Sequence, residues 1–153
     1  MDKLTIKNHK LDIEAMLVCL DKAIEKKTKE LECYSASKGE FGQMFFNQDK
    51  ELLSMAMQCK DNMSFIYDAL NNQLLESENF TSNNANPFYS PRKISQSEIG
   101  KYRTEIIKIK RDFETLVWSS KIEGSTERLA FFEECVSKLN YVYTNIAKLG
   151  NKI

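Results

Sequence analysis

Hydrophobic residues recur at alternating steps of three and four in four separate stretches of the chain. This spacing keeps side chains on one face of an α-helix. The four stripes are Ile13, Leu17, Leu20, Ile24, Leu31 and Tyr34; Leu52, Ala56, Cys59, Met63, Ile66 and Leu70; Ile99, Tyr102, Ile106, Ile109, Phe113 and Leu116; and Leu129, Phe132, Val136, Leu139, Tyr143 and Ile146. They predict an all-α fold of four long antiparallel helices in two hairpins, a four-helix-bundle or coiled-coil-like arrangement with crossing angles of about 20°.

The first hairpin is expected over residues 8–77. Two glycines, Gly39 and Gly42, predict a turn between its helices. The second helix would then begin at Asn47 or Asp49, because either side chain can cap a helix N-terminus.

The second hairpin is expected over residues 95–149, with Gly124 separating its two helices. Between the hairpins, a linker over 78–94 holds both prolines and a polar run with turn composition. A length of 153 residues fits one domain, so we expect residues 1–153 to form a single helical unit.

The last helix has a second apolar row, made of Phe131, Cys135, Val142 and Leu149. Its apolar surface is therefore wider than one helix–helix seam requires. Either this helix lies centrally, or the row packs against another chain. The second interpretation leads us to expect a homo-oligomer.

Composition limits the kinds of partner. The chain carries 22 basic and 22 acidic residues, and this balance gives no sign of a highly charged partner. Its four cysteines form no C-x-x-C pair, so we expect reduced thiols and a cytoplasmic protein. No stretch approaches the roughly 18 apolar residues of a membrane span, so no membrane partner is expected. The many Lys, Asn and Ile residues are typical of AT-rich genomes and fit a phage or a mobile element.

Chemistry inside a helical bundle needs ionisable side chains that point inward. The four stripes contain neither Asp nor Glu, and the chain has no Glu-x-x-His pair and no glycine-rich phosphate loop. His9, the one histidine, is expected to be a solvated residue near the N-terminus. Lys27 occupies a stripe position, where its stem would cover the core while its ammonium reaches water. We therefore expect no enzyme, no metal site and no cofactor.

Aromatic residues gather next to the two breaks in the helical pattern. The candidate partner-binding residues are Phe41, Phe45 and Phe46 after the first turn, and Phe80, Phe88, Tyr89, Arg92 and Lys93 in and around the linker. Aromatic anchors with polar partners are typical of protein interfaces. The favoured function is a non-catalytic protein–protein interaction module, such as an adaptor, an inhibitor or an assembly subunit.

Basic residues are concentrated between residues 92 and 111. An alternative function is a nucleic-acid-binding accessory subunit that contacts phosphates through Lys101, Arg103, Lys108, Lys110 and Arg111. Acidic residues four positions further along the same helix oppose part of this charge, in the pairs Lys101–Glu105, Lys108–Asp112 and Lys110–Glu114. The segment is thus either a phosphate-binding face or a solvated helix face.

A short motif provides a second alternative. The residues Ser-Ser-Lys-Ile-Glu-Gly at 119–124 resemble the inhibitory helix of Fic proteins and their antitoxins, in which Ser or Thr is followed by three residues, then by Glu, and then by Gly or Asn. The resemblance covers six of 153 residues, and the Fic catalytic motif is absent. It implies a Fic-type inhibitory regulator in which Glu123 blocks productive ATP binding by engaging an Arg of a catalytic domain.

Overall fold

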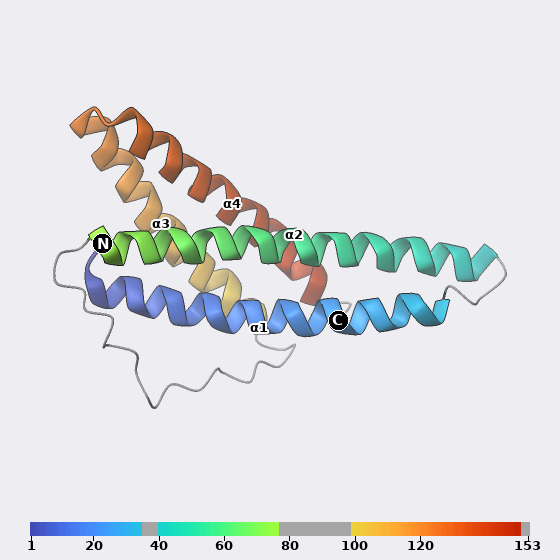
Figure 1. The fold of residues 1–153 in the computed structure, drawn as a ribbon. Helices are drawn as coiled ribbons and strands as arrows, with labels where there is room; N and C mark the ends of the chain where they lie inside the picture. The colour runs from blue at the N-terminus through green and yellow to red at the C-terminus, as the bar shows by residue number, and fades with distance from the viewer. Residues whose placement is uncertain (35–39, 77–98, 151–153) are drawn as a thin grey trace.

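Four helices make up the described part of the protein. The structure, a computed structural model, describes residues 1–34, 40–76 and 99–150. These residues form α1 (Lys3–Tyr34), α2 (Glu40–Glu76), α3 (Ile99–Glu123) and α4 (Thr126–Gly150), and no strand occurs among them (Figure 1). The predicted all-α fold with two helical hairpins is confirmed. No helix in these ranges has an apolar stretch long enough to cross a membrane.

The two hairpins pack across each other. α1 packs along α2 and α3 along α4, while α2 and α4 form the main contact between the hairpins. Figure 1 shows the α3–α4 hairpin lying obliquely over the α1–α2 hairpin, so the four helices do not run side by side over their whole length. Between the hairpins, an oblique crossing therefore replaces the expected near-parallel bundle. The linker predicted over 78–94 lies outside the described residues.

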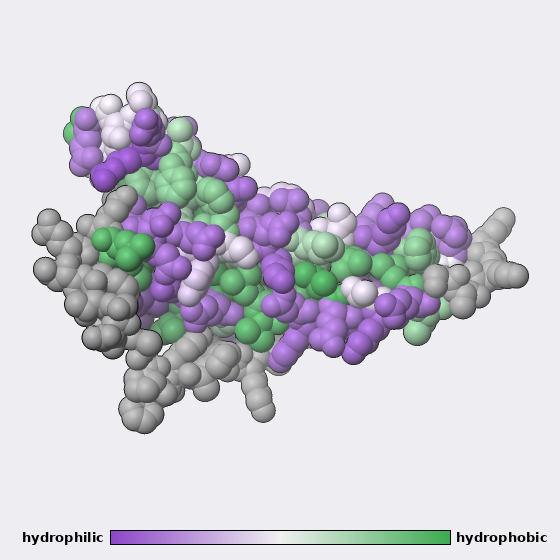
Figure 2. Space-filling model, viewed as in Figure 1, coloured by the Kyte–Doolittle hydropathy of each residue, from purple (hydrophilic) through white to green (hydrophobic). Residues whose placement is uncertain are grey.

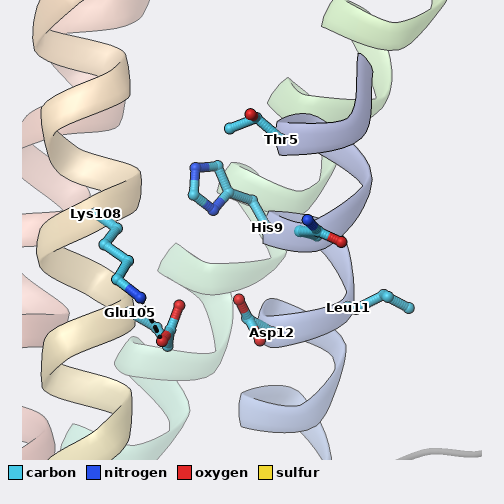
Figure 3. Close-up of a pocket in the computed structure, with 7 residues that line it drawn as sticks. Thr5, His9, Leu11, Asp12, Glu105 and Lys108 are labelled. Carbon is cyan, nitrogen blue, oxygen red and sulfur yellow. Dashed lines mark hydrogen bonds and ion pairs between the residues drawn. The ribbon is translucent and has the colours of Figure 1, made fainter. Parts of the chain in front are cut away.

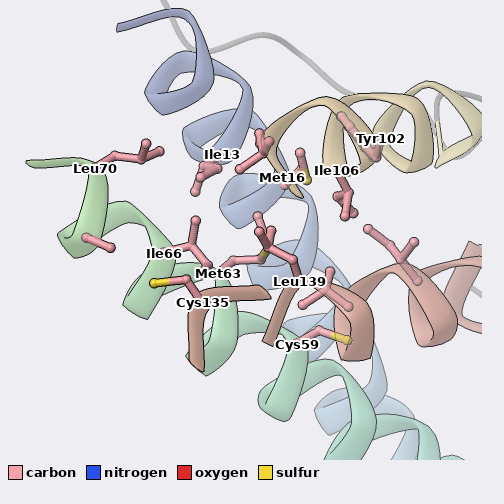
Figure 4. Close-up of a cluster of buried hydrophobic side chains, with 14 of the residues drawn as sticks. Ile13, Met16, Cys59, Met63, Ile66, Leu70, Tyr102, Ile106, Cys135 and Leu139 are labelled. Carbon is pink, nitrogen blue, oxygen red and sulfur yellow. The ribbon is translucent and has the colours of Figure 1, made fainter. Parts of the chain in front are cut away.

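A shared hydrophobic core joins all four helices where the hairpins cross. Met16 of α1, Met63 of α2, Ile106 of α3 and Leu139 of α4 are buried in one cluster (Figure 4). The predicted stripes supply most of this core, because steps of three and four place their residues on the inner face of each helix.

The second apolar row of α4 also packs within the chain. Cys135, Val142 and Leu149 are buried, and the ring of Phe131 lies 5.7 Å from the ring of Phe65 in α2. α4 thus packs against both α2 and α3. The row is therefore buried mainly within its own chain, which favours the interpretation that α4 lies centrally, and the expected homo-oligomer stays a prediction.

The end of the first hairpin extends beyond this core. All the hydrophobic side chains found buried lie outside residues 24–55. Of the described side chains inside that range, only Lys27 is buried. We call residues 24–34 of α1 and 40–55 of α2 the arm. In Figure 1 the arm lies at the right and reaches past α3 and α4.

α1 begins at Lys3, earlier than the expected residue 8. Oδ1 of Asp2 accepts a hydrogen bond of 2.7 Å from the backbone N–H of Thr5, which is the geometry of an N-cap. Hydrogen bonding to this backbone group lowers the pKa of Asp2. The predicted stripe begins at Ile13, but Ile6, seven residues earlier, is also buried, so the hydrophobic spacing extends into the first turns of this helix.

α2 also begins earlier than expected, at Glu40, so the predicted start at Asn47 or Asp49 is wrong. Gly42 lies inside the helix rather than in a turn, where it costs only about 1 kcal/mol relative to alanine. The Asp49 carboxylate does not cap a helix because it pairs with Lys27 of α1.

Gly124 separates α3 from α4 as predicted. Its φ of 74° lies in the left-handed region, which glycine adopts without steric cost. The backbone N–H of Gly124 donates to the carbonyl of Lys121, and that of Ser125 donates to the carbonyl of Ser120. These two hydrogen bonds form a Schellman motif, which ends α3 and leads directly into α4.

Replacing Ile109 by alanine is expected to destabilise the fold far more than the same change at Ile122. Both residues lie on α3, but Ile109 is fully buried and Ile122 is exposed. Ile109→Ala should cost about 2–5 kcal/mol through lost burial and a cavity. Ile122→Ala should change the free energy of unfolding by less than about 0.5 kcal/mol. Chemical denaturation followed by circular dichroism measures both values, and equal losses would contradict this core.

Candidate interaction surfaces

The end of α3 next to the turn exposes two large apolar side chains. Trp118 is 65% exposed and Ile122 is 66% exposed. They are four residues apart on one helix, so their side chains are neighbours on the same face. We call this pair the α3 tip.

Packing on the opposite face of α3 holds the α3 tip outward. Ser120 is buried, and Leu116 and Val117 pack against the core. Because these residues face inward, helix geometry directs Trp118 and Ile122 toward water. The tip therefore sits on a regular helix whose end is closed by the Schellman motif, rather than on a loop.

A shallow pocket lies between α3 and α4 near the same row of α3. Its volume is about 330 Å³, and it is lined by Ile106, Ile107, Lys110, Arg111, Glu114 and Tyr143. Ile107 and Arg111 precede Trp118 by eleven and seven residues, which are close to whole numbers of helical turns. Next to the pocket, the guanidinium of Arg103 lies 4.4 Å from the ring centroid of Tyr143. Along this side of α3, apolar and basic residues therefore lead from the pocket to the α3 tip.

The basic residues considered for nucleic-acid binding do not gather on one side of α3. At 100° per residue, Arg103 and Lys110 lie about 160° round the helix from Lys101 and Lys108. Arg111 falls between the two pairs. A phosphate backbone following one helix face would meet only part of this set, so the arrangement does not favour the nucleic-acid alternative.

Two of these lysines also pair with acidic residues of their own helix. Nζ of Lys108 lies 3.2 Å from Oε1 of Glu105, and Nζ of Lys110 lies 3.7 Å from Oε1 of Glu114. The second pair was predicted. Asp112, the predicted partner of Lys108, contacts His9 of α1.

His9 is buried, so its predicted place as a solvated residue is wrong. It is 6% exposed, and its Nε2 lies 2.5 Å from Oδ2 of Asp112 in α3. The imidazole N–H donates this hydrogen bond across the otherwise sparse contact between α1 and α3. A signal was present in the sequence: His9 precedes Ile13 by four residues and so continues the first apolar stripe.

A pocket of about 460 Å³ opens beside His9 between α1 and α3. Its lining residues are Thr5, Asn8, His9, Leu11, Asp12, Glu105 and Lys108 (Figure 3). The lining combines acidic and basic groups, and Lys108 pairs with Glu105. Across the described ranges, no three His, Cys, Asp or Glu side chains are grouped so that they could hold a metal ion. The pocket thus offers polar contacts of both signs and no defined ligand geometry.

Lys27 is buried between α1 and α2, contrary to the expectation that its ammonium reaches water. Its Nζ lies 2.7 Å from Oε2 of Glu30 and 3.2 Å from Oδ1 of Asp49. Burial lowers the pKa of Lys27, but hydrogen bonds and charge attraction from the two carboxylates outweigh it and leave the pKa raised. The ammonium is therefore charged at neutral pH, and it donates hydrogen bonds to two carboxylates.

The aromatic partner-binding candidates fall partly on the arm. Phe45 is exposed and Phe46 is half-buried, both in the first turns of α2 rather than in a turn before it. Phe41 also belongs to α2, but its side chain lies outside the described set. Phe80, Phe88, Tyr89, Arg92 and Lys93 lie outside the described residues.

Glu123, the blocking residue implied by the Fic resemblance, is the last residue of α3. It is exposed and directly precedes Gly124. A glutamate at this place is compatible with an ordinary helix end closed by a glycine. Its position therefore adds nothing specific to the Fic alternative.

None of the four cysteines is in a disulfide, and their environments differ. Cys33 is exposed, Cys19 is half-buried, and Cys59 and Cys135 are buried. Burial raises the pKa of both Cys59 and Cys135 to about 12. Thiolate is the reactive form, so neither buried cysteine is an activated nucleophile near neutral pH.

Comparisons with models of protein families, with curated proteins and with solved structures found no match. No relative therefore supplies a function for any of these surfaces. Function is therefore inferred from the chemistry of the α3 tip, the arm and the two pockets.

Asp49→Asn is expected to lower the free energy of unfolding by about 1–3 kcal/mol, because it removes one charged partner from a buried ammonium. Glu25→Gln, which breaks the exposed pair with Lys29, should cost less than about 0.5 kcal/mol.

The folded pKa of Lys27 is raised, so the contribution of the buried pair is present below the ordinary lysine pKa and is lost as pH rises through the raised value. Denaturation at neutral and alkaline pH measures both effects, and equal costs for the two variants would contradict the burial of Lys27.

A thiol reagent at pH 8 is expected to label the cysteines in the order of their exposure. Cys33 should react first and Cys19 more slowly, whereas Cys59 and Cys135 should stay unlabelled until denaturant is added. Mass spectrometry of timed samples gives the order. Rapid labelling of Cys59 or Cys135 in the native protein would contradict the packing of α2 against α4.

Proposed function

We propose that this protein is a non-catalytic protein–protein interaction module of the cytoplasm, and that it binds another protein through the α3 tip. The observation that carries the proposal is the exposure of Trp118 and Ile122 side by side on one helix face. Cysteines without disulfide bonds are compatible with the reducing conditions of that compartment.

An exposed tryptophan on a regular helix has the properties of an interface anchor. Trp is among the residues most enriched at energetic hot spots, because its large ring fills a pocket on the partner. The cost of ordering it is small when helix packing already holds the backbone. Leu116, Val117 and Ser120 provide that support for Trp118 and Ile122. A partner with an apolar groove fits this tip.

The non-catalytic part of the proposal is supported by the reactive groups that the described residues contain. His9 is 6% exposed, so little of its ring is open to a substrate. The buried thiols of Cys59 and Cys135 have pKa values of about 12. Lys27 is engaged by two carboxylates.

The double variant Trp118→Ala and Ile122→Ala is expected to lose a partner that the unmodified protein captures from a lysate of the source cells. Losing both anchors should weaken binding at least tenfold, since each hot-spot truncation costs at least about 2 kcal/mol. The matched control is Leu75→Ala, which removes a side chain that is 69% exposed at the far end of α2. Affinity capture with quantitative mass spectrometry compares the three proteins.

The proposal requires at least one protein that the unmodified chain and the Leu75→Ala control both retain and the double variant loses. Circular dichroism checks that all three proteins keep their helix content. Equal capture by all three proteins would contradict binding through the α3 tip.

A further inference from the structure

The arm presents an apolar face that none of the described helices covers. Its two helices contact each other, yet no described hydrophobic side chain in residues 24–55 is buried. Met44 is 46% exposed and Phe45 is 48% exposed, whereas Leu52 and Met55 are half-buried and pack against the edge of the core. Helices in proteins draw most of their stability from packing of an apolar face, so a two-helix arm without a buried aliphatic core is weakly supported.

The exposed face of the arm is a continuation of the face that α4 covers further along α2. Positions 45, 48, 52, 55, 59, 62 and 66 follow one another at steps of three and four, which is the seam of a coiled coil. Cys59 and Ile66 are buried in the core that α4 shares, near Leu139 and Cys135 (Figure 4). The seam therefore loses its covering helix where the arm begins. In Figure 2, apolar surface continues along the first hairpin toward the arm.

The absence of charge in the first turns of α2 favours a second copy of this chain as the occupant of this face. Eight consecutive residues of α2, from position 41 to 48, carry no charge, in a chain where 29% of residues are charged. In a symmetric dimer each patch meets its own copy, so every charge near the axis would face a like charge. An uncharged patch with aromatic and Met side chains avoids this repulsion and matches the composition of interface centres. Gln43, Asn47 and Gln48 add amides, which both donate and accept and can pair with their own copies.

We propose that the arm binds a second copy of this chain, with the 41–55 segments of two α2 helices packing around a two-fold axis and the two arms forming a four-helix bundle. This interface is separate from the row of α4 that α2 already covers. It uses none of the residues of the α3 tip, so it does not rest on the proposed function.

The size of the arm sets the expected affinity of the dimer. Sixteen residues of α2 extend about 24 Å, and two adjacent helices are about 20 Å wide, so two copies would bury roughly 1,000 Å² in total. This area lies at the lower end of specific interfaces. We therefore expect a dimer that forms in the micromolar range and dissociates on dilution.

The test compares two methionine substitutions on α2. Met44→Glu places a charge on the proposed interface, and Met57→Glu places the same charge on a residue of similar exposure, 50%, about 140° round the helix. Sedimentation equilibrium from about 1 to 500 µM should show a dimer for the unmodified protein and for Met57→Glu. Met44→Glu should raise the dissociation constant at least tenfold. A monomer throughout for the unmodified protein, or equal behaviour of the two variants, overturns the proposal.

A second measurement does not depend on how well the charged variant folds. A benzophenone amino acid is placed at position 44, or at position 57 as the control, in a mixture of isotopically heavy and light chains. Irradiation should join heavy to light chains from position 44 but not from position 57, with the cross-link ending in residues 40–55. Cross-links within one chain only, or heavy–light cross-links that end elsewhere, overturn the proposal. Loss of the dimer with intact capture by the α3 tip separates this interface from the proposed function.

Discussion

The crossing of α2 and α4 is where hydrophobic burial holds the two hairpins together. α1 and α3 touch at few positions, so most of the surface buried between the hairpins belongs to α2 and α4. Burial of apolar surface is favourable by about 25 cal/mol per Å², and neither hairpin alone would cover its inner stripe. Because the crossing is oblique, it covers only part of each hairpin. The arm and the α3 tip are the two parts that it leaves uncovered.

The number of helices follows from the hydrophobic period, and their pairing follows from the glycine turns and the linker between the stripes. Ile66 and Ile109 lie within long stripes and are buried as predicted. Helix starts are harder to predict, because a capping side chain can have another use: Asp49 is a good cap, but it pairs with Lys27 across the hairpin. The oblique crossing could not be predicted, since a stripe shows which face of a helix is buried and not the direction of the helix that covers it.

Candidate sites were less predictable than the fold, because exposure depends on where a distant helix ends. Phe45 was identified from its aromatic neighbours and is indeed exposed. Trp118 was missed, because the sequence does not show that the hairpins cross obliquely and leave this end of α3 uncovered. His9 was misplaced even though it continues an apolar stripe. A polar residue in such a stripe indicates a buried partner, and here that partner, Asp112, is 103 positions away in the chain.

Lys27 also restricts how α1 can slide along α2. A shift of one helical turn would move its ammonium about 5.4 Å along the axis and away from the Asp49 carboxylate. Both charges would then lie in a poorly solvated place without each other, a penalty that a leucine or methionine at this position would not impose. An aliphatic seam tolerates several alignments of similar energy, whereas this ion pair is satisfied in one. The arm therefore has a single preferred register although it has no aliphatic core of its own.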